Sequence, residues 1–255
     1  MEKLNYRRTF FIGLAFLSIC AFWQMYDNVI PLILQNTFHL NETFTGAIMA
    51  ADNILAVFLL PFFGTLSDKA NTRLGKRTPF IIVGTSIAVL FLMVLPFADK
   101  KQNFIMFVIC LAVLLVAMGF YRSPAVALMP DLTPKPLRSK ANAVINLMGA
   151  IGGVYTLLLI RFLVKGGTSP DYTAVFAGVA FLMVVAVILL VVTVKEKKIA
   201  AEIEKEEIEE EEIAGETVAA NTKELPRSVK KSLYMILLSI FFWFAAYNAV
   251  TTAFS

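Results

Sequence analysis

Long apolar runs alternate with short polar segments along the chain, and this alternation is its dominant pattern. A run of about 20 apolar residues, coiled as an α-helix, is long enough to cross the ~30 Å hydrocarbon core of a bilayer. The predicted spans are residues 9–34, 44–66, 80–97, 104–129, 141–164 and 172–194, followed by a further apolar run at residues 232–254. A spanning helix satisfies its own backbone hydrogen bonds, which lipid cannot do for it. The pattern therefore predicts an all-α, polytopic helical membrane protein.

Basic residues are distributed unevenly over the segments between these runs. Short cytoplasmic loops of membrane proteins carry an excess of lysine and arginine. The N-terminal segment and the loops after the second and fourth spans carry Lys3, Arg7, Arg8, Lys69, Arg73, Lys76, Arg77, Lys135, Arg138 and Lys140. The alternate loops carry only Lys100, Lys101 and Lys165. The sequence therefore predicts a cytoplasmic N-terminus and a cytoplasmic loop between the second and third spans.

The segment that follows the sixth span has a different composition. Residues 202–216 hold nine glutamates and one lysine, so they cannot bury a core and are expected to be solvated. Isoleucines recur loosely at helical spacing between positions 199 and 213, so part of the segment could instead extend the sixth span as an exposed helix. We expect a six-span bundle at residues 1–194, an acidic cytoplasmic linker at 195–231 and the truncated first span of a second half at 232–255.

The composition limits the classes of protein that fit. The chain is 58% hydrophobic and 16% charged, whereas a soluble domain is closer to a quarter charged. The net charge of +4 comes from loop bases, so it does not indicate a nucleic-acid partner. Cys20 and Cys110 lie within apolar runs, and the single histidine, His39, lies in an outer loop. The sequence shows no metal cluster, nucleotide-binding loop or nucleophile–base pair, so we expect no metal, no cofactor and no enzyme.

The loop between the second and third spans carries the most specific motif of the chain. Its spacing is Gly64-x-x-Ser67-Asp68-x-x-x-x-Arg73-x-Gly75-Lys76-Arg77. This motif resembles the signature loop of the major facilitator superfamily. The flanking Pro61 and Pro79-Phe80-Ile81 narrow the resemblance to the sucrose-transporter-like branch, which is related to the glycoside–pentoside–hexuronide cation symporters. A second stretch, Pro124-x-x-Ala127-Leu128-x-x-Asp131-Leu132-Thr133, resembles the end of the fourth span in that branch. The resemblance implies the N-terminal six-helix bundle of a major facilitator fold plus the start of helix 7.

A weak internal repeat agrees with this resemblance. When the chain is shifted by 221 residues, Trp23 falls on Phe244, Tyr26 on Tyr247 and Asp27 on Asn248. Parallel repeats of six spans are typical of the transporter class that the motif indicates. Chance similarity between two apolar, aromatic helices is the alternative. If the repeat is real, the missing C-terminal half of the same transporter is a partner of this chain.

The resemblance also implies a role for the loop motif. Asp68 is expected to face the N-terminus of a helix in the missing half, where the helix dipole favours a carboxylate. Arg73 and Arg77 could clamp Asp131 at the end of the fourth span. Such a cluster would hold the cytoplasmic side shut in one state and release it in the other. The alternative is that the bases are ordinary charges of a cytoplasmic loop.

Three ionisable residues, Asp27, Asp52 and Arg122, fall inside predicted spans, in addition to Arg161 near the outer end of the fifth span. Such residues are costly in lipid and mark functional sites. Trp23 and Gln24 share a helix face with Asp27, and an aromatic ring beside an acid and an amide suits a sugar. A carboxyl group removed from water keeps its proton more readily, so either acid is a candidate coupling group, with Arg122 as its ion-pair partner or as a substrate clamp. Alternatively, Asp27 is solvated at the outer interface or pairs structurally with Arg122.

Small and polar residues complete the candidate set. Gly64 and Gly75 are expected where the chain approaches a neighbour closely or needs unusual dihedral angles. Gly149 and Gly153 form a GxxxG pattern in the fifth span, which predicts close helix packing. Asn146 in the same span could line a cavity or form an interhelical hydrogen bond.

Two departures limit what the resemblance implies. Registered on Pro124, the positions of the acid and the arginine in the fourth span of plant sucrose carriers hold Leu115 and Val126 here. Registered on the motif of the second span, the positions of the paired acids of melibiose-type relatives hold Ala56 and Leu60. Neither coupling site carries over.

The sequence favours a secondary active transporter that moves a sugar or glycoside across the plasma membrane, coupled to protons or sodium. Its expected partners are the lipid bilayer and a small-molecule substrate, with no nucleic acid. An exporter of drugs or lipids from the same superfamily is the first alternative, although its cavity should be more apolar. A membrane-embedded sensor or enzyme is the second, although it would need a catalytic constellation or a large soluble domain.

Overall fold

The computed structural model describes residues 4–164 and 170–213, together with residues 229, 231, 232, 234–236, 238, 239, 242, 243 and 246. Helices account for nearly all of the first two ranges. They are α1 (Tyr6–Asn36), α2 (Glu42–Lys69), α3 (Thr78–Lys100), α4 (Phe104–Asp131), α5 (Arg138–Leu163), α6 (Thr173–Thr193) and α7 (Glu196–Ile213), with a short 3₁₀ turn, η1 (Lys135–Leu137), before α5. Within these ranges, α1 to α6 are long and apolar enough to cross a membrane, which confirms the predicted fold class.

Helices α1 and α2 begin a few residues before the apolar runs, where asparagine side chains cap them. The side chains of Asn5, Asn41 and Asn103 accept hydrogen bonds from backbone N–H groups in the first turns of α1, α2 and α4, over 2.9–3.1 Å. Asparagine is among the preferred capping residues because its oxygen satisfies an otherwise unpaired donor. Helix α3 differs, because Arg77 stands at its N-cap position without a side-chain capping bond.

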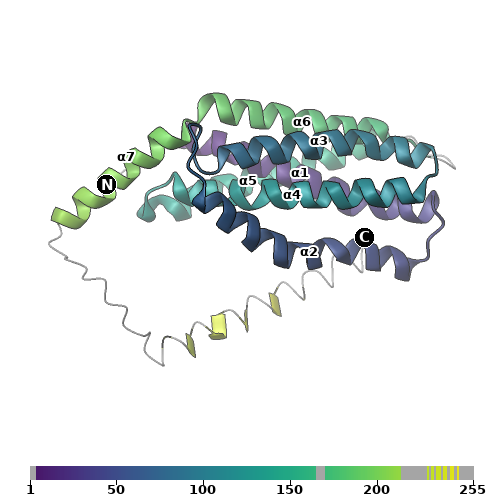
Figure 1. Ribbon diagram of the computed structural model, residues 1–255, viewed down its shortest axis with the longest axis horizontal. Coiled ribbons are helices and arrows are strands. Elements are labelled where there is room, and N and C mark those ends of the chain that lie inside the picture. The colour runs from purple at the N-terminus through teal and green to yellow at the C-terminus, as the bar shows by residue number, and fades with distance from the viewer. Residues whose placement is uncertain are drawn as a thin grey trace. The chain divides into compact units, whose positions relative to one another are not determined.

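The bundle is built around α1. Phe22, Met25 and Tyr26 are almost completely buried, and α1 packs mainly against α5 and α6. Helices α3 and α4 pack against each other, and α2 lies along α4 with few other neighbours (Figure 1). Among the residues of α2, only Thr45, Phe63 and Ser67 are buried. Helix α2 therefore exposes most of its apolar surface.

Glycines bring α1 and α5 close together. A Cβ atom on Gly152 would lie 2.0 Å from the carbonyl oxygen of Leu17, and one on Gly149 would lie 2.9 Å from the sulfur of Cys20. The packing role predicted for the GxxxG pattern is therefore confirmed for Gly149, and Gly152, which lies outside the pattern, makes the closest approach. Gly153 is less tightly placed, since its Cβ would lie 3.4 Å from the side-chain oxygen of Gln24.

The acidic segment begins with a helix. Helix α6 ends at its C-cap, Val194, and α7 starts at Glu196. Residues 196–213 are therefore helical, as the alternative expected, but they form a separate helix and do not extend α6. The chain divides into two compact units, Met1–Glu207 and Ile208–Ser255, so α7 belongs to both. Most of the predicted seventh span, including Phe244, Tyr247 and Asn248 of the internal repeat, lies outside the described residues.

Candidate functional site

Arg77 collects several residues of the loop motif around one guanidinium group. Its Nε donates to Oδ2 of Asp131 at 2.8 Å, and its terminal nitrogens donate to Asp68 and Ser67 and, at 3.4 Å, to the carbonyl oxygen of Gly64. Only 6% of Arg77 is exposed. The planar fork of arginine suits two carboxylates at once. We call these five residues the Arg77 cluster.

The positions of these residues make the cluster a junction of helix ends. Ser67 and Asp68 lie in the last turn of α2, Asp131 is the last residue of α4, and Arg77 immediately precedes α3. The Ser67 hydroxyl also donates to the carbonyl oxygen of Gly64 over 2.9 Å, which fixes its orientation. The Arg77 guanidinium therefore ties together the ends of three helices.

Two basic residues of the motif lie outside this junction. Arg73 and Lys76 have exposed side chains, and neither forms an ion pair within the described part of the chain. Asp131 is thus clamped by Arg77 and not by Arg73. The structure gives Arg73 and Lys76 the surroundings of ordinary loop charges, whereas Arg77 has those of an internal structural residue.

Glu196 joins the same region from the start of α7. Its carboxylate accepts hydrogen bonds from the backbone N–H groups of Lys76, Arg77 and Thr78 at 2.7, 2.9 and 2.8 Å, and from the Thr78 hydroxyl at 2.7 Å. These are the unpaired donors at the start of α3, where the helix dipole favours negative charge. Glu196 therefore takes the place of the missing N-cap. Glu196 falls in the segment expected to be an acidic linker, and no motif of the sequence points to its role.

Gly75 makes room for Glu196. Its φ angle is +123°, and a Cβ atom there would lie 2.3 Å from the carboxyl carbon of Glu196. The Thr72 hydroxyl closes the turn by donating to the carbonyl oxygen of Gly75 at 2.6 Å. The prediction of an unusual dihedral angle is confirmed for Gly75. Gly64 instead allows α2 to approach α4 closely, because a Cβ atom on it would lie 3.1 Å from the Ser123 hydroxyl oxygen.

A second group of predicted residues meets in the membrane-spanning part of α1, α2 and α4. The guanidinium of Arg122 lies over the ring of Trp23, 5.5 Å from its centroid. Asp52 interacts electrostatically with Arg122, and Asp27 interacts with Asp52. The structure therefore brings together four of the six candidate residues, which we call the Trp23–Arg122 group.

This group carries unused hydrogen-bonding capacity. Trp23 Nε1 and the Tyr26 hydroxyl are buried without a hydrogen-bond partner in the described part of the chain. Asp27 is exposed and Asp52 half-buried, and Oδ1 of Asp52 accepts from the Asn53 amide at 3.0 Å. Buried donors without partners are costly unless a ligand or water completes them. Two acids, a cation, an aromatic face and free donors can bind a polar molecule that carries several hydroxyl groups.

Gln24 and Asn146 are placed differently. The side-chain oxygen of Gln24 faces Gly153 in the contact between α1 and α5. Asn146 is exposed on α5, and the interhelical hydrogen bond considered for it does not occur among the described residues. Neither residue makes a polar contact with Arg122 there, so the structure does not bring them into the Trp23–Arg122 group.

Comparisons with known proteins agree with the fold and the motif. A family model described as Major Facilitator Superfamily matches residues 12–255. The chain is 27% identical to the sucrose transport protein SUC3 of Arabidopsis thaliana, over 52% of this chain and 25% of that protein. It is 24% identical to a general alpha-glucoside permease of Schizosaccharomyces pombe, over 84% of this chain and 42% of the permease.

A third relative, a probable nitrate transporter NarT of Staphylococcus epidermidis, is 26% identical over 76% of this chain and 48% of that protein. The matched part of the chain thus spans between a quarter and about half the length of these relatives. The family model covers nearly the whole chain, which shows that the chain is a member of that family. This multi-pass integral membrane protein belongs to the Major Facilitator Superfamily.

Proposed function

We propose that the chain is the N-terminal part of a secondary active transporter that moves a sugar or glycoside by alternating access. The observation that carries the proposal is the Trp23–Arg122 group, in which an aromatic face lies beside a cation and two acids. A sugar ring stacks on an aromatic face through its C–H groups, while its hydroxyls bond to charged and amide groups. Two relatives named for sucrose and alpha-glucoside transport support this substrate class.

The coupling ion is a proton or sodium, and no organic cofactor is needed. Asp27 and Asp52 are the candidate carriers because both are acids within spans and they interact with each other. Arg122 interacts with Asp52 and stands over Trp23, so it links the acids to the substrate face. Loading one carboxylate with an ion would change the charge around Arg122 and hence its hold on the substrate.

The transporter lies in the plasma membrane with its N-terminus and the Arg77 cluster in the cytoplasm, as the distribution of loop bases favours. Its function requires a C-terminal half, since alternating access rocks two halves around a midplane site. An exporter of drugs or lipids is supported less well, because the Trp23–Arg122 group is polar. The relative named as a nitrate transporter makes nitrate the most useful competing substrate.

The proposal is tested by uptake into cells that express the full-length protein. Radiolabelled mono- and disaccharides, glycosides and nitrate are compared, with and without a protonophore and in sodium or choline medium. Saturable uptake of one sugar that collapses when one gradient is removed is the expected result. Uptake of nitrate alone, or of no sugar at all, would contradict the proposed substrate class.

Substitution of the acids identifies the coupling group. We expect Asp27→Asn and Asp52→Asn to lower sugar uptake at least about tenfold, because each substitution removes a carboxylate charge from the Trp23–Arg122 group. The variant that has lost the coupling carboxylate should also lose the dependence of uptake on the ion gradient. Glu42→Gln is the matched control, because Glu42 is an exposed acid in the first turn of α2. Normal gradient dependence in both aspartate variants would rule out this assignment.

A further inference from the structure

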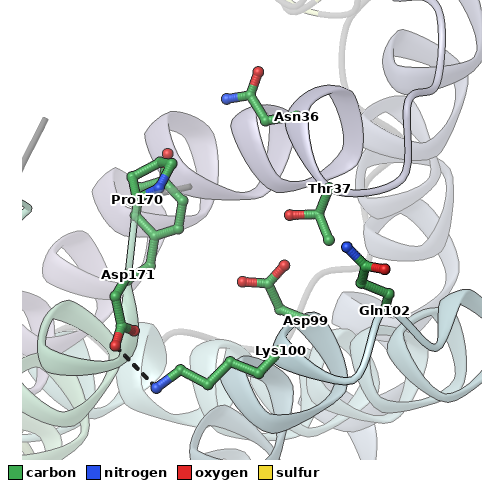
Figure 2. A pocket seen from close by; sticks show the side chains of 8 residues that line it. Asn36, Thr37, Asp99, Lys100, Gln102, Pro170 and Asp171 are labelled. Atoms are coloured by element: carbon green, nitrogen blue, oxygen red, sulfur yellow. Dashed lines mark ion pairs between the residues drawn. The ribbon is translucent and has the colours of Figure 1, made fainter. Parts of the chain in front are cut away.

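A polar pocket of about 280 Å³ lies at the end of the bundle opposite the Arg77 cluster. It is formed where α1 and α3 end and α6 begins (Figure 2). Its lining residues are Asn36, Thr37, Asp99, Lys100, Gln102, Pro170, Asp171 and Tyr172. None of these belongs to the Trp23–Arg122 group, and none was singled out by the sequence motifs. Almost all of the lining can form hydrogen bonds, which is unusual for a surface hollow beside six apolar spans.

Asp171 is already neutralised within this pocket. One carboxylate oxygen pairs with Nζ of Lys100 at 2.9 Å, and the other accepts from the backbone N–H and the hydroxyl of Thr173 at 2.9 and 2.5 Å. Hydrogen bonds from Thr173 and then Lys100 lower the pKa of Asp171 to about 2. Lys100 and Asp171 therefore cancel each other, and Asp171 also caps the start of α6.

Asp99 is left without such compensation. Only 9% of the residue is exposed, and its Oδ1 has no hydrogen-bond partner in the described part of the chain. Figure 2 shows its carboxylate directed into the pocket, toward Thr37, while the Lys100 side chain extends away to Asp171. The Thr37 side chain lies next to this carboxylate, and the charges of Lys100 and Asp171 act on it in opposite directions. A buried carboxylate with one neutral partner is costly unless a positive charge accompanies it.

The helix ends around the pocket add to its negative character. Helices α1 and α3 both direct their C-termini, the negative ends of their dipoles, at it. The positive N-terminus of α6 is offset by Asp171. The remaining polar side chains that line the pocket, those of Asn36, Gln102 and Tyr172, are uncharged.

We propose that this pocket binds a small monovalent cation, held by the Asp99 carboxylate and the Thr37 hydroxyl. Divalent ions usually take two or more carboxylates, and the described residues contain no group of three acidic, histidine or cysteine side chains that could hold a metal. One free carboxylate among neutral oxygens, with a lysine nearby, fits a single positive charge. The site lies within one six-helix bundle, so it stabilises the joint of α1, α3 and α6, independently of the proposed substrate and coupling site.

The test measures the thermal unfolding midpoint of the purified full-length protein in detergent. Sodium chloride is titrated against N-methylglucamine chloride at constant ionic strength and neutral pH, with lithium and potassium as further probes. A saturable rise of the midpoint is expected for the wild-type protein with at least one of these ions. Asp99→Asn should abolish the rise and should unfold at a higher temperature than wild type without the ion, because the uncompensated charge is gone.

Four further variants separate this site from the rest of the molecule. Asp27→Asn and Asp52→Asn should retain the rise, since they alter only the proposed coupling group, and Glu42→Gln is the control for removing an exposed acid. Thr37→Val keeps the carboxylate but removes its hydroxyl partner, so the half-saturating concentration should increase about tenfold. It replaces Asp99→Asn if that variant does not fold.

Several outcomes would overturn the proposal. If the cation raised the unfolding midpoint of Asp99→Asn as much as that of wild type, the cation would bind elsewhere. The same holds for Thr37→Val if Asp99→Asn does not fold. A rise lost in Asp52→Asn but kept in Asp99→Asn would assign it to the coupling group. A wild-type protein that responds to none of the alkali cations, or only to acidification, would show that Asp99 takes up a proton instead.

Discussion

Glu196 acts as the N-cap of a helix that begins 118 residues before it in the sequence. Its carboxylate satisfies three consecutive backbone N–H groups and the Thr78 hydroxyl, and only 4% of the residue is exposed. Such a buried charge is tolerated because every hydrogen bond it accepts comes from the positive end of α3. The contact also needs Gly75, the one residue of the motif with a left-handed backbone.

Gly75→Ala should therefore disrupt this contact. The methyl group would meet Glu196 at 2.3 Å and would also be strained at a φ of +123°. We expect a loss of about 1–3 kcal/mol in the free energy of unfolding, measured as a lower thermal midpoint in detergent. Gly46→Ala is the matched control, because nothing lies within 4 Å of a Cβ there and α2 continues through it. Equal midpoints for Gly75→Ala and wild type would show that Glu196 is not held as described.

The resemblance of the loop motif predicted the contact between Arg77 and Asp131, but it predicted neither the ion pair of Arg77 with Asp68 nor the role of Glu196. Ser67, Asp68 and Arg77 stand at fixed offsets in one loop, and Asp131 ends a second recognisable stretch. Glu196 begins a segment rich in glutamate, so nothing local distinguishes it from its neighbours. Its role arises only when the tertiary fold brings α7 to the start of α3.

At the scale of whole helices, the contact between α1 and α5 is the closest in the bundle. Without a hydrophobic driving force in lipid, helix association depends on tight packing, which small residues permit. Gly152 lets the α5 backbone meet the Leu17 carbonyl of α1 directly. The Thr156 hydroxyl adds a hydrogen bond to the carbonyl oxygen of Ala21 at 2.9 Å, one turn further along.

Gly152→Ala should separate these helices. A Cβ atom would lie 2.0 Å from the Leu17 oxygen, and a backbone atom cannot give way as a side chain does. The expected cost is about 1–3 kcal/mol or more, seen as a lower unfolding midpoint or poorer recovery of folded protein from membranes. The neighbouring Gly153→Ala should change little, because its Cβ would meet only the tip of Gln24 at 3.4 Å. If both variants behaved alike, the tight approach at Gly152 would be refuted.

Hydropathy predicted the six helices because the bilayer imposes both their length and their composition. The predicted ends fell short where polar caps such as Asn5 and Asn41 extend a helix beyond its apolar run. Periodicity could not decide between linker and helix for the acidic segment, since its isoleucines are widely spaced. Helical spacing predicted Trp23 beside Asp27, and Arg122 was expected to pair with one of the acids. The position of Arg122 over Trp23 could not be predicted, because it depends on how α1 and α4 cross.

For the molecule as a whole, the Arg77 cluster joins the ends of α2, α3 and α4 at one end of the bundle. Arg77 holds α2 and α4 through Asp68, Ser67 and Asp131. Its own backbone N–H is held by Glu196, so α7 is part of the same junction. Because Arg77 is shared among several acceptors, loss of one contact loosens the junction without dissolving it. We predict that this junction acts as a two-state latch in the proposed alternating-access mechanism.

Asp68→Asn should weaken this latch while leaving the fold intact. The Asp68 side chain is 58% exposed, and asparagine keeps an oxygen that can still accept from Arg77, so the unfolding midpoint should change little. Losing the charge weakens the ion pair between Asp68 and Arg77 and so changes the free-energy difference between the closed and open states. A change of about 1.4 kcal/mol in that difference alters the ratio of the two states about tenfold. Transport of the substrate should therefore fall by about that factor, while equilibrium substrate binding and expression stay near wild type.

Lys69→Gln is the control, because Lys69 is an exposed neighbouring charge that forms no ion pair within the described residues. If Asp68→Asn transported at the wild-type rate, or if Lys69→Gln lowered transport equally, the loop charges would serve only to orient the protein in the membrane. A selective loss in Asp68→Asn, with binding preserved, would instead locate the defect in the change between states, because binding and interconversion draw on different contacts.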